Sequence, residues 1–454
     1  MNPPDTNDAH PPRAVLVSHK HPFPTDDGKK AVLAGFVAWL VERFGPQQVT
    51  YVVLDRPPEG GVAEPLPCET LWIAPPGRTE QAAHALASLV GVAPLSLQEA
   101  MTWSGRVAAE LEALVAQRRP SLLVLDTIRT GQYFWHARPG GPRRVLYMDD
   151  LFHLRFARLA ALAGQGAGGP AVAPAGTFAR MLPSPVRAML AWPALRNLLY
   201  RLESRKVERR EIAAPQRFDA CLLINPDEAA LLRRRAGAAA ERVQAVRPLL
   251  MLGPPPPPRA YTGEALYVLF GSLRHPVHRA SVLRFLGPEG DAVFAALPRL
   301  QLAIVGEGAD GEVAAACRAR PGVDLAGFVA DITPLFARAC ALLVPSLVGG
   351  GLRLKALTAM HHGLPIVATA AGIEGLPLQD GRDVLIADAP AGFAGPMQRL
   401  LDPAFNRRIG TAAGDVFERE FGRTRVFAEF DSLFGMRADA GVLTANSIAP
   451  STVS

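Results

Sequence analysis

The segment VPSLVGGGLRLKALTAMHHGLPIVATAAGIEGL, residues 344–376, contains the strongest local pattern in the chain. An apolar run that is typical of a buried strand ends at Pro345, and three consecutive glycines, Gly349–Gly351, follow it. Because glycine has no Cβ, such a loop lets the backbone approach a ligand closely. A helix is expected from about Leu352, and its N-terminus would offer unpaired N–H groups and a positive dipole end to a diphosphate.

Two basic residues, Arg353 and Lys355, bring positive charge to the same loop. On helical spacing Lys355 shares a face with Thr358, whereas Arg353 lies well round the helix. Arg353 would therefore have to sit at the loop junction to reach the same ligand. The alternative interpretation is a plain glycine turn followed by a solvated basic pair, and three glycines alone would favour it.

Short apolar runs alternate with helical stretches on both sides of this segment. Alternation of this kind predicts parallel sheets that are covered by helices on both faces. In the C-terminal half the predicted strands are residues 265–272, 301–308, 322–328, 340–346, 365–372 and 383–388. In the N-terminal half they are residues 14–18, 49–55, 121–126, 143–148 and 218–225, with helices expected over 28–44, over 97–118 and from Pro226.

Five consecutive prolines, Pro254–Pro258, separate the two series. Such a run cannot continue a helix or a central strand, and it favours an extended linker. The sequence therefore predicts an α/β fold with two Rossmann-like domains that face a central cleft. The expected divisions are a disordered N-terminus over 1–12, an N-terminal Rossmann-like domain over 13–250, a linker over 251–262, a C-terminal Rossmann-like domain over 263–410, a helix over 411–435 that returns towards the N-terminal domain, and a disordered tail over 436–454.

Composition argues against several classes of protein. Hydrophobic residues make up 49% of the 454 residues and charged residues 20%, which provides enough apolar material for sizeable cores. Every apolar run falls short of the roughly 18 residues that a membrane-spanning helix needs. Residues 1–12 lack the apolar core of a signal peptide. A cytoplasmic protein is therefore expected.

Charge and cysteine usage narrow the range of partners. The formal net charge is only +6, which argues against nucleic acid and leaves an anionic substrate or membrane surface open. The four cysteines, Cys68, Cys221, Cys317 and Cys340, lie far apart, so neither a zinc site nor a disulfide framework is expected.

Lysine is rare in this arginine-rich chain, and its few positions are informative. Lys20, Lys29 and Lys30 lie in the first strand-to-helix loop, and Lys355 lies in the glycine-loop segment. A compact ammonium group suits a phosphate, which favours a phosphate-binding role for Lys29 and Lys355. Because lysines are so few, chance and an ordinary basic surface loop remain alternatives.

Residues 344–376 resemble the donor-site motif of glycosyltransferase family 4, whose members have the two-domain GT-B fold. The helix KALTAMHHGLPIVAT and the turn GIEGL match that pattern nearly position by position, and residues 271–285, 302–308 and 327–345 match the preceding parts in order. The resemblance is strong over about 265–388 and weaker in the N-terminal half. It implies a retaining hexosyltransferase that takes a nucleotide-sugar donor and has no other cofactor and no obligatory metal.

The same resemblance implies a place in polysaccharide or glycoconjugate synthesis, with a sugar, lipid-linked or small-molecule acceptor. The loop HPFPTDDGKK, residues 21–30, is similar to an acceptor-domain loop whose glycine, here Gly28, faces the donor phosphates. For Glu374 a simple turn is the alternative to a contact with the donor sugar. The full set of expected donor-binding residues is Gly28, Lys29, Gly271, Ser272, Gly349, Gly350, Gly351, Arg353, Lys355, Thr358 and Glu374.

Three acids that end strands of the N-terminal sheet are the candidate catalytic residues. Asp126 ends one predicted strand, and Asp149 and Asp150 end the next. Strand ends of this kind point into the cleft of a doubly wound sheet. Family members often carry a His-Asp pair at the second place, so Asp150 is the candidate for orienting the acceptor hydroxyl. Capping of the next helix is an equal alternative for Asp150.

One departure from the family pattern bears on function. The family often has two acidic residues eight apart around the glycine loop, and this chain has Gly350 and Thr358 there. A threonine hydroxyl can bond to a ribose but offers no charged acceptor. Two alternatives to a transferase therefore stay open: a nucleotide-sugar epimerase on the same fold, and a non-catalytic protein of this fold that binds a sugar or a partner.

A basic apolar segment, residues 178–212, follows an expected mobile loop at 164–177 and does not fit the sheet pattern. The favoured interpretation is a helical pair packed on the N-terminal sheet, because Pro183, Pro185 and Pro193 would break any long helix. The alternative is a surface that meets anionic lipid, with the protein peripheral at the inner face of the membrane.

Overall fold

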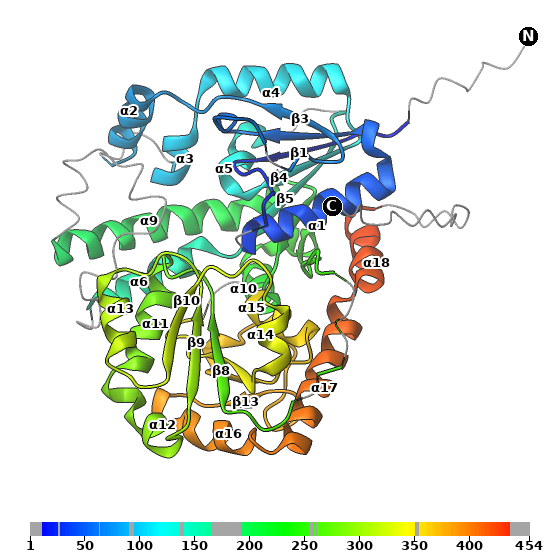
Figure 1. Ribbon diagram of the computed structural model, residues 1–454. Helices are drawn as coiled ribbons and strands as arrows, with labels where there is room; N and C mark the ends of the chain where they lie inside the picture. The colour runs from blue at the N-terminus through cyan, green and yellow to red at the C-terminus, as the bar shows by residue number, and fades with distance from the viewer. Residues whose placement is uncertain are drawn as a thin grey trace, which may run out of the picture.

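The computed structural model describes residues 11–25, 28–62, 64–89, 95–136, 140–164, 192–253, 256, 258–259, 261–349 and 354–435. Within these ranges the chain forms two α/β domains, each built on one parallel sheet (Figure 1). The two-domain α/β architecture that the sequence predicts is therefore confirmed. The expected terminal tails and most of the loop at 164–177 lie outside the described residues.

The first sheet has seven parallel strands in the order β3-β2-β1-β4-β5-β6-β7. This order changes direction between β1 and β4, which is where doubly wound sheets leave a crevice beyond the carboxyl ends of their strands. The strands are β1 (Ala14–Ser18), β2 (Val49–Val53), β3 (Glu69–Trp72), β4 (Leu122–Asp126), β5 (Arg143–Asp149), β6 (Ala220–Leu223) and β7 (Val243–Ala245).

Side chains of β1 alternate between two cores, one on each face of this sheet. Leu16 belongs to the core that contains Phe36 of the first helix, whereas Val15 and Val17 belong to the core on the opposite face. This is the period of two that an extended strand imposes. A strand covered on both faces must be apolar at every position, which is why AVLVS forms a continuous apolar run.

Eight helices of the described residues belong to the first domain. They are α1 (Gly28–Phe44), α2 (Arg78–Leu89), α3 (Leu97–Thr102), α4 (Gly105–Arg118), α5 (Thr127–Gly131), α6 (Phe152–Gly164), α9 (Pro193–Ala213) and α10 (Pro226–Arg235). The single helix expected over 97–118 is wrong, because Trp103 and Ser104 are extended and separate α3 from α4. The short edge strands β3 and β7 were also absent from the prediction, since three or four residues carry little periodicity.

The second sheet has six parallel strands in the order β10-β9-β8-β11-β12-β13. They are β8 (Leu266–Phe270), β9 (Gln301–Val305), β10 (Val323–Gly327), β11 (Ala341–Val344), β12 (Ile366–Ala368) and β13 (Leu385–Ile386). The helices of this domain are α11 (Pro276–Leu286), α12 (Asp291–Ala296), α13 (Gly311–Arg318), α14 (Thr333–Arg338), α15 (Leu354–His361), α16 (Ala394–Arg399) and α17 (Pro403–Phe421).

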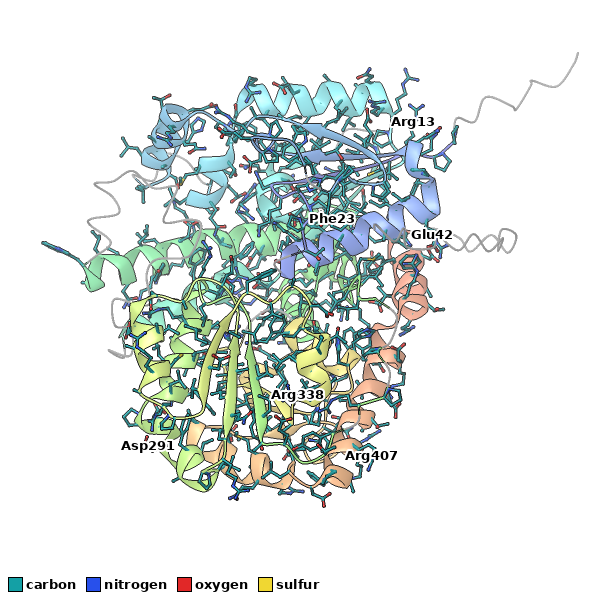
Figure 2. The ribbon with its side chains drawn as sticks, viewed as in Figure 1. Arg13, Phe23, Glu42, Asp291, Arg338 and Arg407 are labelled. Carbon is teal, nitrogen blue, oxygen red and sulfur yellow. The ribbon has the colours of Figure 1, made fainter. Side chains whose placement is uncertain are left out.

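The last described helix, α18 (Arg423–Phe434), packs on the first domain although the chain has just left the second. The ring of Phe430 stacks against Phe36 at 5.1 Å between centroids. Arg43 of α1 donates to Asp431 at 2.7 Å, and Glu42 pairs with an arginine at the start of α18. Figure 2 shows Glu42 on α1 close to this helix. The chain therefore crosses between the domains a second time.

Helix α9 contains nearly all of the described part of the basic apolar segment. Pro193 is the first residue of α9, where a proline lacks no hydrogen bond and its fixed φ suits the helix. The helix then continues for 21 residues without interruption. Pro193 therefore begins a helix, and any other helix of the expected pair would lie in residues 178–191. Residues 178–191 lie outside the described ranges.

Candidate active site

Three strand ends of the first sheet meet the first residues of α1. Ser18 Oγ at the end of β1 donates to Asp126 Oδ2 at the end of β4, at 2.7 Å. Lys29 Nζ lies 2.5 Å from Asp126 Oδ1 and 3.4 Å from Asp149 Oδ2. The same ammonium sits 4.2 Å from the ring centre of Tyr147, within cation–π range. One lysine therefore holds two of the three predicted catalytic acids in place.

Asp149 is the most accessible of these acids. Its side chain is 23% exposed, against 3% for Asp126. Tyr147 donates to Asp149 Oδ1 at 2.9 Å, and the backbone of Asp149 has a left-handed φ of 70°. Burial opposes ionisation of Asp149, but the charges of Lys29 and Arg155 hold its pKa below the usual value. A strained, ionised carboxylate at a strand end is a common feature of a reaction centre.

Asp150 is buried, unlike its neighbour. Its side chain is only 3% exposed and is held by Arg155. Burial raises the pKa of Asp150, and the charge of Asp149 raises it further. The exposed fraction of the Asp149 side chain, 23%, is therefore much larger than that of Asp150. The geometry favours Asp149 rather than Asp150 as the acid that an acceptor can reach.

Two glutamates accept the first backbone N–H groups around the start of α6. Glu228 accepts from Leu151 N at 2.6 Å, and Glu211 accepts from Phe152 N at 2.8 Å. Burial raises the pKa of Glu228 to about 7, and the neighbouring Asp150 contributes to that shift. Glu228 and Glu211 thus accept hydrogen bonds from backbone N–H groups at the start of α6. Capping of this helix was the alternative role considered for Asp150.

The second domain contributes its own strand ends to the same region. Gly271, which follows β8, has a φ of 140°, and a Cβ there would lie 3.1 Å from His278 Nε2. Lys355 in the first turn of α15 lies with its Nζ 3.2 Å from His278 Nδ1. Ser272 follows Gly271 and is half-buried. Gly271 and Lys355, two of the predicted donor-binding residues, therefore lie around one histidine.

Glu374 closes the other side of this region. Its Oε2 would lie 1.4 Å from a Cβ placed on Gly349, so the carboxylate rests directly on the glycine loop. Arg158 of α6 donates to Glu374 Oε1 at 3.1 Å and also lies 3.9 Å from Glu228 Oε1. The contact between Arg158 and Glu374 joins the two domains. Glu374 therefore lies between the glycine loop and α6.

The remaining predicted residues lie as follows. Gly28 begins α1 against the second domain, where an added Cβ would lie 2.7 Å from a side-chain atom of Leu354. Thr358 Oγ1 donates back to Leu354 O at 3.1 Å. Gly350, Gly351 and Arg353 lie outside the described residues.

Sequence reasoning missed several residues of this site. Ser18 ends a predicted strand and could have been found by the rule that gave Asp126. His278, Arg158 and Glu228 lie on helices, and no local pattern distinguishes them. They join the site because packing brings α11, α6 and α10 to the strand ends.

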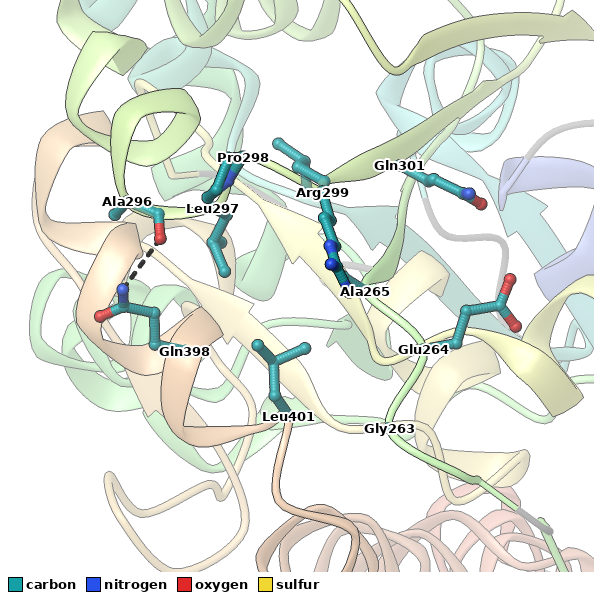
Figure 3. A pocket seen from close by; sticks show the side chains of 11 residues that line it. Gly263, Glu264, Ala265, Ala296, Leu297, Pro298, Arg299, Gln301, Gln398 and Leu401 are labelled. Atoms are coloured by element: carbon teal, nitrogen blue, oxygen red, sulfur yellow. Dashed lines mark hydrogen bonds between the residues drawn. The ribbon is translucent and has the colours of Figure 1, made fainter.

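A separate hollow lies at the amino ends of the strands of the second sheet (Figure 3). It has a volume of about 520 Å³, and Leu297, Leu300, Leu401 and Arg299 are among its lining residues. Leu300 and Gln301 stand at the amino end of β9, whereas the candidate site lies beyond the carboxyl ends. The hollow is therefore remote from the residues described above.

Part of the second domain matches a known family of proteins. Residues 267–403 match the family model described as Glycosyl transferases group 1. The matched region begins in β8 and ends at the start of α17, so it contains Gly271, Gly349, Lys355 and Glu374. The group 1 match supports a glycosyltransferase. No curated protein matches the sequence at a significant level.

Solved structures align with nearly the whole chain. Sucrose-phosphate synthase from Thermosynechococcus elongatus has a TM-score of 0.58 at 17% identity and covers 93% of this chain and 98% of its own. WaaG, a glycosyltransferase involved in lipopolysaccharide biosynthesis, has a TM-score of 0.58 at 13% identity, with coverages of 93% and 100%. Alr3699/HepE from Anabaena in complex with UDP and glucose has a TM-score of 0.54 at 12% identity, with coverages of 93% and 99%.

The chain also aligns with TarM at a TM-score of 0.54 and 12% identity, over 72% of this chain and 57% of the length of TarM. At these low identities the likenesses show the fold alone, which is GT-B. The expected GT-B architecture is thus confirmed. Within the described ranges no helix is long and apolar enough to cross a membrane.

Proposed function

We propose that this protein is a retaining glycosyltransferase that moves a sugar from a nucleotide-sugar to a hydroxyl group of an acceptor. The observation that carries the proposal is the group 1 glycosyltransferase match over 267–403, which falls on the domain whose loops gather Gly349, Lys355 and Glu374. Retention of anomeric configuration rests on the resemblance to family 4. A role in polysaccharide or glycoconjugate synthesis is part of the same proposal.

The donor would lie against the second domain. Lys355 is placed to meet the leaving diphosphate, since its ammonium projects from the first turn of α15. Positive charge there stabilises the negative charge that develops as the leaving group departs. Glu374, beside Gly349, is placed to accept hydrogen bonds from the donor sugar. Because HepE is described with UDP and glucose, UDP-sugars are the first donors to test.

The acceptor would lie against the first domain. The acceptor oxygen forms a bond to the anomeric carbon, the bond from that carbon to the diphosphate breaks, and the acceptor proton passes to the departing diphosphate. Asp149, the more exposed acid, would orient the acceptor hydroxyl, and Lys29 would keep it ionised. An acid with a lowered pKa is a poor general base but a good hydrogen-bond acceptor. The site residues proposed here need no metal for this step.

A non-catalytic binding protein is the second candidate, and one observation favours it. Thr358 stands where the family often has a carboxylate, and its hydroxyl donates to the backbone of its own helix. A ribose would then meet a neutral oxygen rather than a charged acceptor. Binding without turnover would follow if that contact were essential for catalysis.

Turnover of a labelled donor separates the two candidates. The full chain is incubated with a panel of nucleotide-sugars, and both hydrolysis and transfer are measured. Lys355→Ala serves as the site variant and Arg407→Ala, an exposed residue on α17, as its control. Turnover that Lys355→Ala abolishes and Arg407→Ala leaves intact supports the transferase. Saturable binding without turnover of any donor overturns it in favour of a binding protein.

A further inference from the structure

Exposed hydrophobic side chains gather on two helices of the first domain. Among the described residues seven large hydrophobic side chains are exposed, and five of them lie on α2 or at α9. Trp192, immediately before α9, is 74% exposed, and Leu86 on α2 is 62% exposed. The other three are Leu89, Leu198 and Leu202. Single apolar residues are common on protein surfaces, but a group of this size marks an interaction site.

The polarity of α9 is inverted relative to an ordinary surface helix. Its buried stripe consists of Tyr200, Glu203, Val207 and Glu211, at spacings of three and four residues. Glu203 accepts from backbone N–H groups at the start of α3, and Glu211 contacts His153. Burial raises the pKa of each glutamate to about 7. The helix thus keeps carboxylates inside and leucines outside.

The outer face of α9 combines leucine with arginine. Its exposed residues form one stripe along the helix, and they are Ala194, Leu198, Arg201, Leu202, Arg205 and Arg209. No carboxylate of α9 is exposed: Glu203 and Glu211 are buried, and Glu208 is half-buried and paired with Arg235. The outer face is therefore apolar towards its N-terminal end and purely basic towards its C-terminal end.

Helices α2 and α9 contact one another directly. Lys206 of α9 donates to the backbone oxygen of Ser88 near the end of α2, and Leu199 packs against Ala85. Figure 1 shows the two helices on the same side of the first domain, with the N-terminal end of α9 reaching outermost. The apolar residues of α2 and α9 are therefore held together by direct contacts between the two helices.

We propose that this face, the α2–α9 surface, docks the protein on an anionic lipid bilayer. The surface is defined by Leu86, Leu89, Trp192, Leu198, Leu202, Arg201, Arg205 and Arg209. Tryptophan and leucine enter the boundary between headgroups and acyl chains, while arginines beside them meet lipid phosphates. A bilayer interface suits both parts of the surface, because it takes up the apolar side chains and offers anionic headgroups to the arginines.

Binding to vesicles tests the docking, and it does not require the protein to be an enzyme. The full chain is sedimented with vesicles of phosphatidylcholine alone and with vesicles of phosphatidylcholine mixed with anionic phosphatidylglycerol. We expect binding to the anionic vesicles that weakens as salt rises, because salt screens exposed charges. The emission of Trp192 should shift to the blue on binding, and Trp192→Phe should lose that shift.

Matched variants distinguish binding through the α2–α9 surface from nonspecific binding to vesicles. Arg205→Gln with Arg209→Gln should weaken binding to anionic vesicles about fivefold for each arginine removed. Leu198→Gln with Leu202→Gln should weaken it at least tenfold, since two buried leucine side chains are lost. The controls are Arg407→Gln, on the opposite side of the molecule in Figure 2, and Phe328→Gln, which is 71% exposed on the second domain. Both controls should bind like the wild type.

Three results would overturn the proposal. The first is equal binding of the wild type to neutral and anionic vesicles, or binding to neither. The second is equal weakening in the α2–α9 variants and in the two controls. The third is a dimer in analytical ultracentrifugation that Leu198→Gln with Leu202→Gln converts to a monomer, which would assign the surface to a second copy. Circular dichroism of each variant checks the fold. We expect the fold to be intact, because every substituted side chain is exposed.

Discussion

Lys29 Nζ lies 2.5 Å from Asp126 Oδ1, although the two residues belong to different elements of the first domain. The ammonium at the start of α1 neutralises an acid at the end of β4, and it reaches Asp149 at the end of β5 as well. Both acids that Lys29 pairs with in this structure thus belong to its own domain. A direct contact between Lys29 and donor phosphate would require it to leave at least one of these partners.

The first prediction concerns this lysine. Lys29→Met leaves Asp126 buried without a counter-charge, so we expect a loss of about 2–3 kcal/mol in the free energy of unfolding at pH 7.5. This loss of stability is somewhat smaller than the loss on removing one partner of a fully buried ion pair, because Asp149, the second partner of Lys29, is partly exposed. The pKa of Asp149 is held low, so its contribution is present above the unfolded pKa and lost as the pH falls through the folded pKa.

The deficit of Lys29→Met should therefore be smaller at about pH 2.5, below the unfolded pKa of Asp149, than at pH 7.5. Urea unfolding at the two pH values measures it, with Arg407→Met as the exposed control. Equal deficits at both pH values would show that the lysine acts through packing of its methylenes rather than through its charge.

The second prediction concerns the phosphate site. Lys355→Ala should weaken binding of UDP, or of whichever nucleoside diphosphate the wild type binds, by about 1.5–3 kcal/mol, because a hydrogen bond to a charged group is lost. Isothermal calorimetry measures the change. Arg407→Ala should bind like the wild type. Unchanged affinity in Lys355→Ala would remove this lysine from the donor site.

The third prediction uses the contact between Gly349 and Glu374. A methyl group on Gly349 would lie 1.4 Å from Glu374 Oε2, so Gly349→Ala must displace the carboxylate and disturb its contact with Arg158. We expect kcat/KM for donor turnover to fall at least tenfold, as for loss of one hydrogen bond to a charged group. Gly311→Ala is the matched control, because a Cβ there meets no atom within 4 Å. If both variants behave alike, Glu374 does not contribute to donor turnover.

The fourth prediction concerns pH. Burial and Asp150 raise the pKa of Glu228 from 4.5 to about 7. The folded state then holds a proton that the unfolded state has released between these values, so this group lowers the stability as the pH rises from about 4.5 to 7. Glu228→Gln removes the titration and keeps an acceptor for Leu151 N. Its stability relative to the wild type should rise with pH by up to about 3 kcal/mol, since one pKa unit is worth about 1.4 kcal/mol.

Unfolding free energies of the wild type and Glu228→Gln between pH 5 and 8 measure this difference. Parallel curves would mean that Glu228 is ionised throughout the range.

The fifth prediction concerns Thr358. If the donor ribose lies there, Thr358→Glu should tighten nucleotide-sugar binding by about 0.5–1.5 kcal/mol, the worth of one added hydrogen bond. The lost bond from Thr358 Oγ1 to Leu354 O costs little, because it is a local contact within a helix. Thr358→Gln, with the same length and no charge, is the control. Weaker binding in both variants would show that the pocket has no room for a longer side chain.

The sequence by itself determined the alternation of strands and helices and most of the strand ends. Periodicity and continuous apolar runs are local properties, so AVLVS and LLVLD predict buried parallel strands without any knowledge of their neighbours. The glycine loop at 349–351 and the acids that end strands follow from the same local rules. The break at Trp103 was missed because Trp103 and Ser104 are extended, and two extended residues leave little mark on the helical pattern around them.

Only the tertiary structure decided which of these ends meet and which side chains face the cleft. Arg158 and Glu374 are separated by 216 positions and touch only because two domains pack together. Asp149 and Asp150 are adjacent in sequence, yet the strand turns one towards solvent and the other into a cluster with Arg155 and Glu228. The inverted polarity of α9 likewise depends on what its inner face packs against. Such relationships arise from contacts between distant segments, and no pattern within a short stretch of sequence encodes them.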